Sequence, residues 1–115
     1  MFTLRWTDEA ASEYARLKDK AESALRPRNS KARNKAGRDV GLFKQVHKCV
    51  SLPAENPRHP GLHTHEYRSL EHPFHPRDKV FEAYAQNRTP GAYRVFWCYG
   101  PDAGQMTIIA ITPHP

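Results

Sequence analysis

The sequence predicts an α+β fold: an N-terminal strand, then a helical hairpin packed on one face of a mostly antiparallel sheet. Three observations support it. A short alternating strand pattern opens the chain, two stretches with helical spacing follow, and the second half holds segments rich in β-branched and aromatic residues. This order of elements is typical of the α+β class. Because 115 residues suit a single core, we expect residues 1–115 to form one domain.

The first two elements are a strand over residues 2–6 and a helix that begins near residue 8. Residues 2–6 alternate apolar and polar side chains, which is the period of a strand with one buried face. Thr7 can cap the helix, and Asp8 and Glu9 lie in its first turn, where the helix dipole favours negative charge. Apolar side chains then recur at three- and four-residue spacing until Pro27: Ala10, Tyr14, Leu17, Ala21 and Ala24.

A second helix is predicted after a basic connection. Its apolar positions are Ala36, Val40, Phe43, Val46 or His47, and Val50. Gly37 and Gly41 weaken this helix by about 1 kcal/mol each relative to Ala. Pro53 and Asn56-Pro57 are expected to stop it, because proline disfavours helix at and before its own position.

Strands should make up the remainder of the chain. A short strand is predicted over 62–67, and three longer ones over 80–85, 92–99 and 106–112, where β-branched and aromatic residues are frequent. Thr89-Pro90-Gly91 and the segment 100–104 have the composition of reversing turns. The last three strands should therefore pair as antiparallel hairpins.

The charge of the chain predicts a polyanionic partner, RNA above all. Lys and Arg number 18 against 12 acidic residues, giving a net charge of +6 and a pI near 9.6. The positive charge is concentrated between Glu22 and Asp39, a stretch without acids. Its basic residues are Arg26, Arg28, Lys31, Arg33, Lys35 and Arg38. The alternative is a solvated connection with no ligand.

Several classes of function are not favoured by the sequence. Cys49 and Cys98 fall in apolar patterns that suit buried thiols and a reducing cytoplasm. We expect residues 1–4 to lead into the first strand rather than to form part of a signal peptide. His63 and His65 would share a strand face, but no second pair of metal ligands accompanies them, so we expect no metal or other cofactor. Phosphate-binding glycine loops and nucleophile elbows are absent from the sequence.

Strand parity assigns candidate site residues to the sheet face opposite the helices. Residues two apart in a strand share a face, so Tyr93, Val95, Trp97 and Tyr99 should face the helices. Arg94, Phe96 and Cys98 should then lie on the other face.

The neighbouring strands would add further groups to that face. Glu82 and Tyr84 should join Arg94 there, as should Thr112 and His114, while Ile109 and Ile111 point to the core. His65 is an outlying member. Carboxylate and imidazole groups can transfer protons and a guanidinium can hold a phosphate, which suits phosphodiester cleavage. The alternative is a Glu82–Arg94 ion pair with no catalytic role.

With this order of elements the chain resembles, over essentially its full length, the RelE/ParE superfamily of toxins from bacterial toxin–antitoxin systems. Residues 2–6 are similar to the first strand of that family, and 56–62 to its link from hairpin to sheet. The most specific likeness is 80–84 followed by 91–97. Tyr93-Arg94 matches a family Tyr-Arg pair whose arginine holds the RNA phosphate in members that cut messenger RNA.

Membership implies a metal-independent, ribosome-dependent endoribonuclease that inhibits translation and is neutralised by a cognate antitoxin. The resemblance implies catalytic roles for Arg94, His114, Glu82 and His65, with Glu82 or His65 as base. Tyr84 departs from the family pattern, which often has arginine there. Residues expected to contact nucleic acid are Lys79, Arg88, Arg28, Lys31, Arg33 and Lys35.

Two other functions fit the same scaffold. A ParE-like protein would inhibit DNA gyrase by binding it and would cut no RNA. A non-catalytic nucleic-acid-binding module is the remaining alternative.

Overall fold

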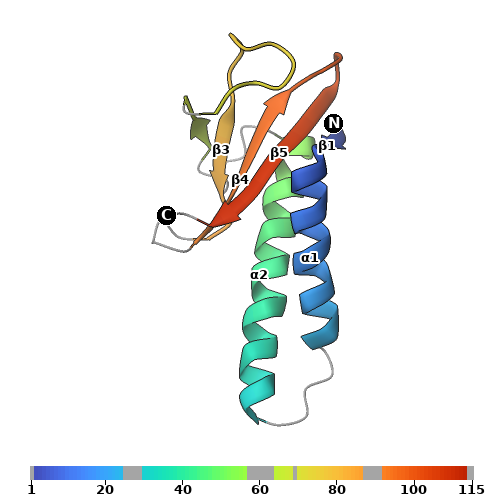
Figure 1. The fold of residues 1–115 in the computed structure, drawn as a ribbon, viewed down its shortest axis with the longest axis vertical. Coiled ribbons are helices and arrows are strands. Elements are labelled where there is room, and N and C mark those ends of the chain that lie inside the picture. Colours follow the sequence, from blue (N-terminus) through green and yellow to red (C-terminus); the bar gives the residue numbers. More distant parts are fainter. Residues whose placement is uncertain (1, 25–29, 57–63, 69, 87–91, 114–115) are drawn as a thin grey trace.

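The computed structural model describes residues 2–24, 30–56, 64–68, 70–86 and 92–113, with the backbone alone for 30–36. It contains two helices and a mixed five-stranded sheet, so the α+β class predicted from the sequence is correct (Figure 1). The elements are β1 (Thr3–Trp6), α1 (Asp8–Ala24), α2 (Ser30–Glu55), β2 (His65–Glu66), β3 (Phe81–Tyr84), β4 (Tyr93–Tyr99) and β5 (Gln105–Pro113).

The strands are ordered β1-β5-β4-β3-β2 across the sheet. β1 runs parallel to β5, with Thr3 opposite Gln105, while the other three pairings are antiparallel. Two parallel strands need a long crossover connection. Here the connection from β1 to β5 contains both helices and the other three strands. The N-terminal strand therefore closes one edge, and the two-residue β2 closes the other.

Thr7 fixes the start of α1 against the sheet. Its hydroxyl oxygen accepts a hydrogen bond from the backbone N–H of Ala10 at 3.1 Å, as a helix cap does. The same hydroxyl donates to the carbonyl of Ile109 at 2.6 Å. One side chain thus caps α1 and ties it to β5.

Helix α2 is longer at both ends than the sequence indicated. It begins at Ser30, so most of the basic stretch lies in the helix rather than in a connection. It also continues through Pro53 to Glu55, which makes the predicted stop at Pro53 wrong. Packing offsets the cost of the proline, because Pro53 and Ala54 are buried and the Ala54 carbonyl accepts the N–H of Phe2 at 2.6 Å.

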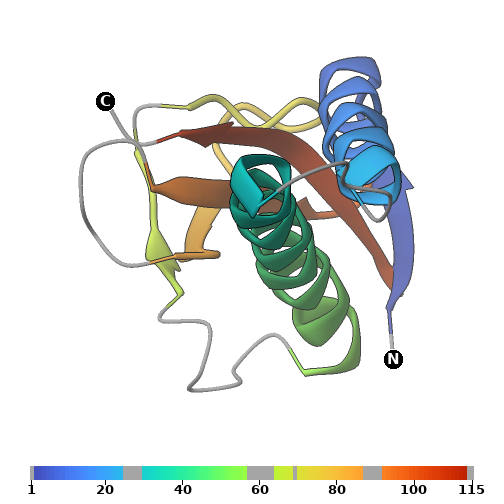
Figure 2. The ribbon, with the colours of Figure 1, turned by 90° about the horizontal axis from the view of Figure 1, so that it is seen from below.

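The helices cover one face of the sheet. Figure 2 shows them side by side, seen end-on, and α1 packs against β5 while α2 packs against β4. Their buried side chains form a single cluster with the strand residues Val95, Trp97, Met106, Ile108 and Ile111. Phe81 stacks on Trp97 in this cluster, with ring centroids 4.7 Å apart. The predicted parity of β3 and β4 is therefore correct.

The opposite face carries a smaller apolar cluster. Val80, Phe96 and Cys98 are buried there against Tyr67 and Leu70, which come from the segment between β2 and β3. Figure 1 draws this segment in yellow at the end of the molecule away from the tip of the hairpin. Part of the face that the sequence left uncovered is thus covered by the segment between β2 and β3.

A register shift in β4–β5 overturns the expected position of Ile109. Phe96 pairs with Ala110, whereas the next residue, Trp97, pairs with Ile108. Ile109 is the extra residue of this bulge and packs with the smaller cluster, not with the helices. Parity counting fails at a bulge because one residue is added without a partner.

The hairpin extends well beyond the sheet. The molecule measures 50 × 25 × 23 Å, and Figure 1 shows that the ends of α1 and α2 nearest their connection project past the strands. Helix α2 has 26 residues and therefore spans roughly 39 Å, at 1.5 Å per residue. Neither described helix is both long and apolar enough to cross a membrane.

Candidate functional site

The sheet face opposite the helices brings three predicted site residues together. The register places Glu82 of β3 directly opposite His65 of β2 on one side and Phe96 of β4 on the other. Arg94 lies two residues from Phe96 along β4, opposite Tyr84 and on the same face. Directly opposed side chains share a face, so the pairing alone makes these groups neighbours.

Glu82 is the centre of the cluster. Only 2% of its surface is exposed, and both carboxylate oxygens are engaged. Oε2 accepts a hydrogen bond from Arg94 Nη1 at 2.8 Å, and Oε1 lies 2.6 Å from His65 Nε2. A buried carboxylate requires such partners, since an isolated charge in this position would cost several kcal/mol. The Glu82–Arg94 ion pair that the sequence suggested is therefore present.

Arg94 is held by aromatic rings as well as by Glu82. Its guanidinium carbon lies 4.8 Å from the centroid of the Phe96 ring and 5.7 Å from that of Tyr67. These two rings pack on each other at 4.7 Å. The Arg94 side chain is 12% exposed, and its buried Nε has no hydrogen-bond partner in the described part of the chain. Cation–π contacts hold the guanidinium in one orientation.

His65 is the member of the cluster most accessible from solution. Its side chain is 40% exposed, and its ring lies 5.7 Å from that of Tyr84. The carboxylate of Glu82 accepts, so Nε2 carries the proton that points at Oε1, and the orientation of the imidazole is fixed. A substrate that approached this face would meet His65 and part of Arg94 before it met Glu82.

The start of β4 is anchored to α1 through Tyr93. The Tyr93 hydroxyl accepts a hydrogen bond from Arg16 at 3.1 Å and lies 3.4 Å from a Glu13 oxygen. Arg16 also donates to Glu13 at 2.6 Å, and this hydrogen bond lowers the pKa of the Glu13 carboxyl and raises that of the guanidinium. Because Tyr93 precedes Arg94, the network fixes the backbone that carries the arginine.

Of the other predicted site residues, the structure describes the side chain of Lys79, which lies outside the cluster. Lys79 lies just before β3 with its side chain 68% exposed, and its Nζ is 4.0 Å from Glu66 Oε2. His114, Arg88 and Arg28 lie outside the described residues. Three further basic residues have helical backbone in α2 and undescribed side chains: Lys31, Arg33 and Lys35.

A surface cavity of about 400 Å³ lies beside the cluster and shares Tyr67 with it. Its rim combines three acids with two cations: Glu66, Glu71, Asp78, Arg68 and Lys79. This mixed charge does not match a polyanion. Among the described residues, no group of three or more His, Cys, Asp or Glu side chains is arranged to hold a metal ion.

Sequence reasoning missed the structural role of His72. It is 3% exposed, and its Nδ1 accepts the backbone N–H groups of Phe74 and His75 at 3.1 and 3.0 Å. Nε2 must then carry the proton, which it donates to the Tyr99 carbonyl at 2.8 Å. His72 thus ties the segment before β3 to the end of β4. Its neighbouring proline, typical of a loop, concealed this role.

Comparisons with protein-family models, with curated proteins and with solved structures gave no significant match to this chain.

Proposed function

We propose that this chain is an RNA-cleaving toxin of the RelE/ParE type, acting on messenger RNA at the ribosome and neutralised by a cognate antitoxin. The observation that carries the proposal is the contiguous cluster of His65, Glu82 and Arg94 on the sheet face opposite the helices. The order of a strand, two helices and then strands, with Tyr93-Arg94 at the start of β4, supports it further.

The cluster offers the groups that metal-free RNA cleavage requires. A base removes the proton of the ribose 2′-hydroxyl, whose oxygen attacks the adjacent phosphorus while the bond to the 5′-oxygen breaks. The products are a 2′,3′-cyclic phosphate and a 5′-hydroxyl, whose proton comes from solvent water or an acid such as His114. Arg94 would stabilise the negative charge that develops on the phosphate oxygens.

Burial favours His65 over Glu82 as the base. Glu82 is 2% exposed with both oxygens engaged, so a 2′-hydroxyl has no direct access to it, whereas His65 is 40% exposed. Glu82 then acts as a positioning residue that orients the imidazole, as the carboxylate does in other His–carboxylate pairs. The sequence left these two candidates open.

Primer extension on a message from a cell-free translation reaction tests the proposal. Purified wild-type protein should cut the message only when ribosomes are present, and His65→Ala should remove the cuts. His75→Ala is the matched control, because His75 is an exposed histidine outside the cluster. Intact message with normal translation would refute the proposal, and inhibited DNA supercoiling in a parallel gyrase assay would replace it with the ParE-like function.

A second candidate function, RNA binding without cleavage, is favoured by one observation. Glu82 and Arg94 already satisfy each other, and Arg94 is 88% buried against Phe96 and Tyr67. A site whose charges are neutralised internally can serve stability alone. Salt-dependent RNA binding by wild-type protein, with no cut in the ribosome-containing reaction, would establish this function.

A further inference from the structure

Most of the net positive charge of the chain lies in one helix. α2 contains six Lys and Arg residues against two acids, a net charge of +4 out of +6 for the whole chain. α1 contains three Lys and Arg residues against five acids, a net charge of −2. The two helices of the hairpin are thus oppositely charged, and an anionic partner would be drawn to α2 rather than to the hairpin as a whole.

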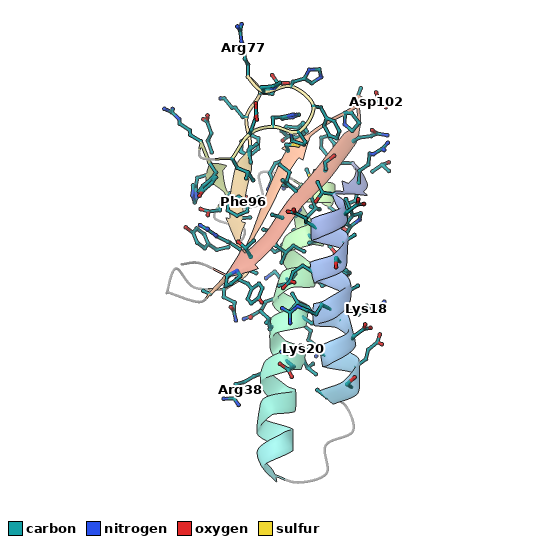
Figure 3. The ribbon with its side chains drawn as sticks, in the orientation of Figure 1. Lys18, Lys20, Arg38, Arg77, Phe96 and Asp102 are labelled. Carbon is teal, nitrogen blue, oxygen red and sulfur yellow. The ribbon has the colours of Figure 1, made fainter. Side chains whose placement is uncertain are left out.

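The described cations of α2 lie on its outward side. Lys44 and Lys48 are exposed and lie opposite the buried Val46 by helical spacing, and the exposed Arg38 lies at one edge of the same face. Figure 3 shows Arg38 on the side of α2 away from α1, and Lys18 on the far side of α1.

Acidic residues do not neutralise this face. The Asp39 carboxylate lies toward α1, 3.8 Å from Lys20 Nζ. Among the described residues, neither Lys44 nor Lys48 has an acidic partner within 4.0 Å. The positive charge of this face therefore remains available to a ligand.

Two glycines interrupt the same face. Gly37 and Gly41 are one turn apart, and a Cβ atom added at either would meet nothing within 4 Å. Packing within the protein therefore does not require glycine there, although glycine disfavours helix relative to alanine. Lys44 and Lys48 are also one turn apart, a spacing at which like charges disfavour helix. Helix stability therefore does not explain the two glycines or the spacing of the two lysines, whereas binding of an anion to this face would.

We propose that one face of α2 binds the phosphate backbone of RNA. This face is formed by Arg38, Lys44 and Lys48, with Gly37 just before Arg38 and Gly41 between Arg38 and Lys44. The inference rests on the proposed function, because it assigns to an RNA-cleaving chain a surface that binds its RNA. The two glycines let a sugar–phosphate strand approach the helix backbone closely. RNA fits better than a protein helix, since the described residues of this face include no exposed apolar side chain.

Binding of a single-stranded RNA oligonucleotide, followed by fluorescence anisotropy over a range of salt concentrations, tests the lysines. Lys44→Gln/Lys48→Gln should bind more weakly, with the slope of log K against log salt reduced by about 2, roughly 1 for each lost phosphate contact. Lys18→Gln/Arg77→Gln removes the same charge from other exposed sites and should keep the wild-type slope. Equal slopes for the two double variants would overturn the inference.

The glycines give a second test in which stability and binding move in opposite directions. Gly37→Ala/Gly41→Ala should raise the melting temperature by about 5 to 10 °C, because helix propensity improves and no atom is displaced. The same variant should bind RNA less tightly. A stabilised variant with wild-type RNA affinity would contradict a role for the glycines.

These outcomes separate the inference from the proposed function. If wild-type protein cuts no message but loses RNA affinity on substitution of the lysines, the binding face stands and the cleavage proposal falls. If it cuts message while the lysine variants bind RNA as wild type does, the binding face falls alone. Binding of an acidic peptide but no RNA would also overturn the inference.

Discussion

Substituting Arg94 tests the energetic role of the cluster. Arg94→Met keeps an unbranched side chain that can pack on Phe96 and Tyr67, but it leaves Glu82 in its buried position with one partner fewer. Removing one member of a buried ion pair typically costs about 3 to 5 kcal/mol. We therefore expect Arg94→Met to lower the free energy of unfolding by about 3 kcal/mol or more.

The matched variant is Arg94→Met/Glu82→Gln, which removes both charges together. Neutralising Glu82 removes the stranded charge, so the double variant should be more stable than Arg94→Met alone. Urea denaturation of wild type, both single variants and the double variant gives a coupling energy, which we expect to be about 2 kcal/mol. A loss of under about 1 kcal/mol for Arg94→Met, or a coupling near zero, would refute this reasoning.

Two further predictions concern buried groups away from the cluster. His72→Ala should lower the free energy of unfolding by about 2 to 4 kcal/mol, since two backbone N–H groups and a carbonyl lose their partner; equal loss in the exposed-site control His75→Ala would contradict it. Burial raises the pKa of Cys49 to about 12 and that of Cys98 to about 11, against 9.0 ordinarily. The unfolded chain therefore loses these protons first, and stability should fall by roughly 2 kcal/mol between pH 8 and pH 10. Chemical denaturation of Cys49→Ala/Cys98→Ala should show a smaller loss of unfolding free energy between pH 8 and pH 10 than wild type. An equal loss in the variant would exclude the two thiols as its cause.

The sequence predicted the elements best where one local signal determined them. Strand parity placed Glu82 and Arg94 correctly on one face, because β3 and the first half of β4 pair without interruption. The cap at Thr7 was also predicted correctly, since a threonine directly before an acidic first turn is a common start of a helix. Both signals depend only on neighbours in sequence.

Long-range packing decided the features that the sequence did not predict. Pro53 stays helical because it is buried and the next residue accepts a hydrogen bond from the N-terminal strand. Ile109 changes face because of a bulge, which no alternation pattern records. The burial of Glu82 under His65 and Arg94, which decides which group can reach a substrate, depends on contacts among three strands.

The central claim is that the His65–Glu82–Arg94 cluster cleaves RNA. The most direct test compares message cleavage by wild-type protein and by Arg94→Met/Glu82→Gln, at equal concentrations of folded protein, in a ribosome-containing reaction. Because the double variant avoids a stranded buried charge, lost activity would report on chemistry rather than on unfolding. We predict cleavage at least about a hundredfold slower, the usual effect of removing a group that stabilises transition-state charge. Cleavage at the wild-type rate would contradict the account.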